Sequence, residues 1–132
     1  DGIRGYFKSA GCVDIDAAGF SGHEPYEKAE KTLMDQINSG CPVPCLTLMH
    51  RDSRFKDFTW HWFMLTGYEK AKDTCMVKAV SYGEWIWLDF KALWDTGYDE
   101  KGGAVYPDTA SSLANLTGRS GRSSALPYPP CE

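Results

Sequence analysis

The clearest periodic pattern in the chain predicts an amphipathic helix over residues 25–38. Four apolar residues recur on one face of it: Tyr26, Ala29, Leu33 and Ile37. Pro25 suits a first helical turn, and Gly40 supplies a stop signal. Two starts are open, since Ser21 with Glu24 resembles a capping box and Glu24 alone is also a candidate cap. The pattern indicates a helix that lies on another layer.

Shorter apolar runs after this helix predict strands. They cover residues 43–50, 58–68, 74–81 and 84–89, with a last short strand at 101–106, and one further strand is predicted before the helix, around residues 12–15. Residues 58–68 are apolar on both faces, which predicts a central strand covered on both sides. Residues 90–95 look like one helical turn. We therefore expect an α+β fold, in which an antiparallel sheet of four to six strands carries the helix on one face.

Composition fits one domain. The chain has 132 residues, 42% of them hydrophobic, and a formal charge of −4. We expect a single α+β domain over residues 1–108 and a tail rich in Gly, Ser and Pro over 109–132. An acidic chain without a Lys/Arg cluster is a poor nucleic-acid binder. No window approaches the ~20 apolar residues of a membrane span, and the N-terminus does not resemble a signal peptide.

Five cysteines are present, an odd number that cannot pair completely within one chain: Cys12, Cys41, Cys45, Cys75 and Cys131. Cys41 and Cys45 have a spacing that suits the start of a zinc site, but no second pair of ligands follows at a matching distance. We therefore expect no metal and no cofactor. Free thiols favour a reducing, cytoplasmic compartment.

His61 is the main candidate for chemistry. It lies within a predicted strand between two tryptophans, and an imidazole with an ordinary pKa near 6.5 serves well as a general base at a cleft. The competing interpretation is a core histidine bonded to a backbone carbonyl. His50 and His23, at a strand end and a helix start, are weaker candidates.

The order of elements around His61 resembles a known family. Its pieces are Asn38-Ser39-Gly40, then Pro42-Val43, the strand Trp60 to Tyr68, Tyr82-Gly83 and Trp87-Leu88-Asp89-Phe90. This order is similar to the second half of the papain-like cysteine peptidases of the bacteriocin-processing (double-glycine leader) type and their uncharacterised bacterial relatives. The resemblance covers roughly residues 25–106.

The resemblance implies a papain-like second-half topology and a thiol hydrolase in which His61 is the general base. Ser81 then stands where the family has the Asp or Asn that orients the histidine. The family's nucleophilic cysteine and its oxyanion glutamine have no counterpart here, so the nucleophile lies in a segment not present or is Cys12. The chain is then a fragment or a degenerate relative, with a peptide or protein substrate and a missing N-terminal half as partners.

Two other functions stay open. One is a non-catalytic domain that keeps the fold and binds an extended peptide by strand addition in a groove beside Trp60, Trp85 and Trp94. In the peptidase interpretation Trp60 and Trp62 are expected to be part of the wall packing, and the candidate binding residues are Trp60, Trp62 and Trp85. The other is a half-domain that folds only with another chain or as a swapped homodimer.

Overall fold

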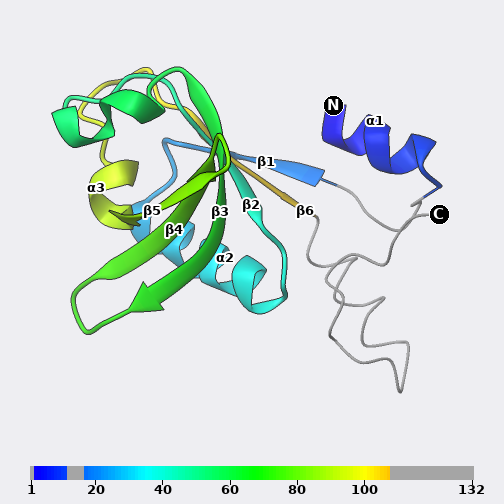
Figure 1. The fold of residues 1–132 in the computed structure, drawn as a ribbon, viewed down its shortest axis with the longest axis horizontal. Helices are drawn as coiled ribbons and strands as arrows, with labels where there is room; N and C mark the ends of the chain where they lie inside the picture. Colours follow the sequence, from blue (N-terminus) through cyan, green and yellow to red (C-terminus); the bar gives the residue numbers. More distant parts are fainter. Residues whose placement is uncertain (1, 12–16, 108–132) are drawn as a thin grey trace.

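A computed structural model describes residues 2–11 and 17–107 of the chain. The helices are α1 (Gly2–Ser9), α2 (Tyr26–Asn38), α3 (Phe90–Trp94) and the 3-10 helix η1 (Ser53–Phe58). The strands are β1 (Ala17–Ser21), β2 (Val43–Thr47), β3 (His61–Lys70), β4 (Cys75–Ser81), β5 (Glu84–Asp89) and β6 (Gly103–Pro107). The α+β expectation is confirmed (Figure 1).

The six strands form one antiparallel sheet in the order β1-β6-β2-β3-β4-β5. Strands β2 to β5 follow one another along the chain as a meander. Strand β6 then returns to lie between β1 and β2, so that side of the sheet is built from strands far apart in the sequence (Figure 1). β3 is therefore a central strand and β5 is an edge strand.

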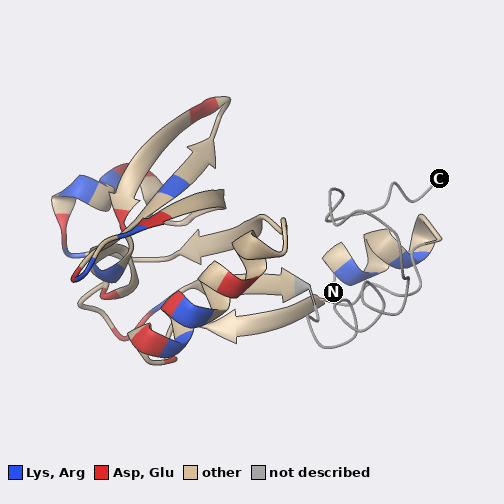
Figure 2. Ribbon diagram, turned by 90° about the horizontal axis from the view of Figure 1, so that it is seen from below, with Lys and Arg blue, Asp and Glu red and all other residues tan. Residues whose placement is uncertain are grey.

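Helices α2 and α3 pack on one face of this sheet. The core between these layers is formed by buried residues of both: Ala29, Leu33, Val43, Cys45, Phe63, Leu65, Val77, Leu88, Phe90 and Leu93. The indole Nε1 of Trp94 donates to the Glu24 carbonyl at 2.8 Å, which links α3 to the start of α2. Residues of both charge signs are interspersed along α2, while the strands are mainly uncharged (Figure 2).

Several expectations need correction. Pro25 precedes α2 without any side-chain cap, so neither predicted capping arrangement forms. Strand β3 is covered on one face only, because Phe63 is buried whereas Trp62 is exposed. Helices α2, α3 and η1 contact the sheet on the Phe63 side, whereas on the other face Ile3 and Phe7 of α1 line a cavity with Pro44 and Met64 and leave Trp62 exposed. The predicted strand around residues 12–15 and the tail at 109–132 lie outside the described residues. Helix α1 was not predicted.

A β-bulge in β3 explains why the strand extends beyond its predicted end. The pairing register with β4 shifts between Leu65 and Gly67, so the side chains after the bulge change faces. Lys70 is thereby turned towards α2, where its Nζ lies 2.8 Å from the Glu30 carboxylate. Tyr68 likewise donates its hydroxyl to Asn38 at 2.8 Å. The bulge thus fastens the end of the β3–β4 hairpin to the helix.

Replacing Tyr106 by Phe is expected to leave stability unchanged or raise the free energy of unfolding by about 1 kcal/mol. The Tyr106 hydroxyl is buried without a hydrogen-bond partner, and its ring packs on Phe20 with centroids 5.2 Å apart. Tyr26→Phe is the matched control, because the Tyr26 hydroxyl donates to Glu30 and its loss is expected to cost about 1 kcal/mol. Urea denaturation of both variants measures the difference, and equal losses would contradict this description of Tyr106.

Candidate functional site

His61 and Ser81 meet at one end of the sheet. His61 begins β3, Ser81 ends β4, and the His61 Nε2 lies 2.6 Å from the Ser81 Oγ. Met64 pairs with Val80, and side chains alternate between the two faces along each strand. The side chains of His61 and Ser81 therefore both lie on the face that carries Phe63. The sheet register, rather than a flexible loop, therefore positions the pair.

The His61 ring is held from its face as well as its edge. The Tyr82 ring stacks on it with centroids 4.9 Å apart and planes 9° apart. Within residues 2–11 and 17–107, Nδ1 of His61 has no hydrogen-bond partner. Ser81 and Tyr82 thus fix the ring and leave one nitrogen available to accept a proton.

The other two histidines have structural contacts. The His50 Nε2 lies 2.9 Å from the Ala92 carbonyl, and its Nδ1 accepts from the Asp52 backbone N–H at 3.0 Å. His23 is held between the Ser21 hydroxyl and the Asp99 carbonyl. A ring nitrogen next to a backbone carbonyl therefore describes the half-buried His50 and the exposed His23, whereas His61 has a side-chain hydroxyl as its partner.

Unusual backbone conformations flank the pair. Trp60 (φ 53°) precedes His61 and Tyr82 (φ 51°) follows Ser81, and among the described residues these are the two that adopt positive φ without being glycine. Tyr82 and Gly83 form the two-residue loop of the β4–β5 hairpin, where both central residues need positive φ. An aromatic residue is disfavoured at such a position, and strain of this kind often occurs at functional sites.

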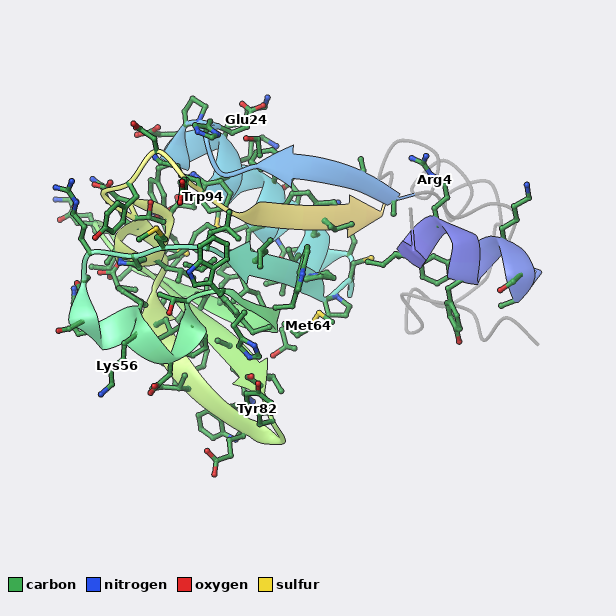
Figure 3. The ribbon with its side chains drawn as sticks, turned by 90° about the horizontal axis from the view of Figure 1, so that it is seen from above. Arg4, Glu24, Lys56, Met64, Tyr82 and Trp94 are labelled. Carbon is green, nitrogen blue, oxygen red and sulfur yellow. The ribbon has the colours of Figure 1, made fainter. Side chains whose placement is uncertain are left out.

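A cleft of about 550 Å³ opens beside Ser81. Its lining comes from η1 and from the β4–β5 hairpin: Asp57, Phe58, Ala79, Ser81, Tyr82, Glu84, Trp85 and Ile86. Figure 3 shows Tyr82 at the tip of that hairpin and Lys56 on η1. The floor is apolar and the rim carries two carboxylates, so the cleft suits a side chain with an apolar stem.

The described thiols are not activated. Cys41, Cys45 and Cys75 are all buried. Burial raises the pKa of the Cys45 thiol to about 12 and also raises the pKa of Cys75, so both are protonated at neutral pH. Cys12 and Cys131 lie outside the described residues. None of the three described cysteines is therefore suited to act as a nucleophile.

The tryptophans differ from the expected wall. Trp60, Trp62 and Trp85 are 66%, 53% and 60% exposed, so Trp60 and Trp62 do not pack as part of a covered wall. Trp94, the last residue of α3, is buried against Phe20 and Phe90 and does not line the cleft beside Ser81. Trp85 does line the cleft beside Ser81. Sequence reasoning did not select Tyr82, although its place in a two-residue loop directly after Ser81 was the available signal.

The charge of Asp52 is expected to matter for acid stability, because Asp52 caps η1, which carries one wall of the cleft. Its carboxylate accepts from the Arg54 backbone N–H at 2.9 Å and from the Arg54 guanidinium, and these contacts lower its pKa from 3.8 to about 2. A carboxyl with a depressed folded-state pKa stabilises the fold above its ordinary pKa, and this contribution is lost as the pH falls from 3.8 towards 2.

Asp52→Asn keeps the capping oxygen but removes the charge. We expect the variant to lose less stability than the parent chain over that acid range, with a smaller free energy of unfolding at neutral pH. Thermal unfolding followed across the range provides the measurement. Parallel stability curves for the two chains would contradict the assigned role of the charge.

The structure and the comparisons add three results. Among the described residues no cluster of His, Cys, Asp or Glu is arranged to hold a metal ion. Within the same part of the chain, no helix has the length and apolar character needed to cross a membrane. Comparison with family models, with curated proteins and with solved structures finds no match. The residues and geometry of the site therefore carry the functional inference.

Proposed function

We propose that this domain is the histidine-bearing half of a papain-like thiol peptidase, with His61 as general base and Ser81 as the residue that orients it. One observation carries the proposal: the 2.6 Å contact between the His61 Nε2 and the Ser81 Oγ, with Nδ1 left open. In the relevant tautomer Nε2–H donates to Ser81, and Nδ1 accepts the proton of a thiol.

The reaction then follows ordinary acyl-transfer chemistry. The thiol proton moves to Nδ1, the thiolate attacks the peptide carbonyl, and the amine leaves with the proton from the imidazolium. Water hydrolyses the resulting thioester with His61 again as the base. Ser81 stabilises the imidazolium less than a carboxylate would, because its hydroxyl carries no charge. We therefore expect modest turnover.

The nucleophile in this proposal is Cys12 or a thiol of another polypeptide segment. The test is alkylation of the full chain with iodoacetamide at pH 7, mapped by mass spectrometry. We expect one cysteine to react much faster than the buried Cys41, Cys45 and Cys75. If all five cysteines react slowly and at similar rates, no thiol in this chain is activated and Cys12 has no catalytic role.

A second function is favoured by the exposed aromatic and aliphatic residues of the β4–β5 hairpin. Trp85, Tyr82 and Ile86 are 60%, 90% and 50% exposed and lie together along one cleft. Exposed aromatic residues at a cleft are common in peptide-binding surfaces. Such a domain binds an extended peptide without cleaving it, and its binding survives His61→Ala.

A further inference from the structure

Within the part of the chain that the structure describes, strand β5 is an edge of the sheet with no partner on its outer side. It is the last strand in the order, and its apolar residues Trp85, Ile86 and Trp87 are at least 36% exposed. Native proteins usually shorten, charge or cover such an edge, because its free N–H and C=O groups pair with any extended chain. Four aromatic and aliphatic residues, Trp85 to Leu88, instead lie along this one between two carboxylates.

The backbone groups that are free on β5 follow from the hairpin. A two-residue loop joins β4 to β5, so Ser81 and Glu84 form the hydrogen-bonded pair next to the loop. Pairing alternates from there, so the N–H and C=O groups of Glu84 and Ile86 point towards β4. Those of Trp85 and Trp87 point away from the sheet, ready to bond a seventh strand.

Acidic groups at both ends of β5 determine which chain suits this edge. Glu84 begins the strand and Asp89 ends it. When a second copy pairs antiparallel with β5 and Trp85 lies opposite Trp87, each Glu84 lies opposite Leu88 of the other copy, next to its Asp89. β5 carries no cation to face either acidic end, so self-pairing lacks charge complementarity. A strand with a cation at each end is complementary.

The cleft beside Ser81 adds a place for one of those cations. Asp57 and Glu84 both line it, above an apolar floor that includes Phe58 and Ile86. A lysine or arginine side chain lays its methylene stem along apolar surface and keeps its charge among carboxylates. The residue of an added strand that lies opposite Glu84 points to this side of the sheet.

We infer that β5 binds an extended basic peptide as a seventh antiparallel strand, with a lysine or arginine in the cleft beside Ser81, which Asp57 and Glu84 line. The peptide's backbone pairs with Trp85 and Trp87, and its cations, five residues apart, lie opposite Glu84 and Asp89. The inference goes beyond the proposed function, since strand pairing requires neither His61 nor a thiol. Its cleft adjoins Ser81, so the same peptide is presented to the candidate site.

The test uses the fluorescein-labelled peptide Lys-Val-Thr-Val-Thr-Lys and a matched control peptide, in which glutamate replaces the lysine at both ends. Fluorescence anisotropy with the full chain at low salt is expected to show at least about tenfold tighter binding of the lysine peptide. The variant Glu84→Lys is expected to reduce this preference. His61→Ala is expected to bind as the parent chain does, so binding is measured independently of thiol chemistry.

N-methylation of the peptide separates strand pairing from charge attraction without altering the protein. Methylating the two threonines blocks the amides that face β5 and is expected to abolish binding, whereas methylating the two valines leaves it intact. Equal binding of the lysine and glutamate peptides would overturn the inference. The inference would also be overturned if methylation of the threonines and of the valines had the same effect on binding. Self-association of the chain through β5, measured by sedimentation, would overturn it as well.

Discussion

Alkylation of the reactive cysteine is expected to slow at least about tenfold when His61 is replaced by alanine. An ordinary thiol with a pKa near 8.5 is only a few per cent ionised at pH 7, whereas a thiol paired with an imidazolium is largely ionised. Some of that gain is offset, because a thiolate of lower pKa is less nucleophilic. Iodoacetamide kinetics at pH 7 with mass-spectrometric mapping measure the effect.

Ser81→Ala provides the graded comparison. Loss of one neutral hydrogen bond is worth about 0.5–1.5 kcal/mol, so we expect a decrease of about threefold to tenfold in the same rate. The His61 ring keeps its stacking on Tyr82 in this variant, which separates orientation from the presence of the base. A rate unaffected by His61→Ala would refute the proposal that His61 activates a thiol of this chain.

Gly102→Ala is expected to destabilise the fold by about 3 kcal/mol or more. A Cβ at this position would lie 1.7 Å from the Leu46 carbonyl oxygen and 2.4 Å from its carbon, both of which belong to backbone. The clash pushes β6 away from β2. The hydrogen bond that the Gly22 N–H donates to the Gly102 carbonyl at 3.0 Å is then also lost. Urea denaturation gives the free energy of unfolding.

Gly19→Ala is the matched control in the neighbouring strand β1. No atom lies within 4 Å of a Cβ there, so the substitution is expected to change stability by less than about 0.5 kcal/mol. If Gly102→Ala is as well tolerated as Gly19→Ala, strand β6 does not lie against β2 as described.

The parts of the fold that follow from local patterns were predictable. Helix α2 begins one residue from its predicted start, and β5 has its predicted bounds, because an amphipathic period and tight turns determine both. The α+β class follows from the same signals. The topology within that class, in which β6 lies between β1 and β2, depends on contacts between residues more than fifty positions apart, which periodicity does not encode.

Three features were missed for physical reasons. Helix α1 contains Gly2 and Gly5, which weaken its propensity. The bulge at Thr66 reverses the alternation within β3 and hides the strand's true end. The face that carries Trp62 looked covered because Trp62 and Met64 are apolar, yet composition does not show whether a second layer exists.

The candidate site was partly predictable. The sequence points to both His61 and Ser81, one through its chemistry and one through its place in a resemblance. Tyr82 was not chosen, because its stacking on His61 requires a left-handed aromatic residue in a turn where asparagine or glycine is usual. Such a conformation cannot be read from composition or period.

The protonation pattern of the His61 ring tests the central claim most directly. Nitrogen-15 NMR of the folded chain distinguishes a ring protonated on Nε2 from one protonated on Nδ1. If Ser81 orients the base, the neutral ring carries its proton on Nε2, and that N–H signal is protected from exchange in the parent chain but not in Ser81→Ala. A ring protonated on Nδ1, with the Ser81 hydroxyl donating to Nε2, would contradict the account.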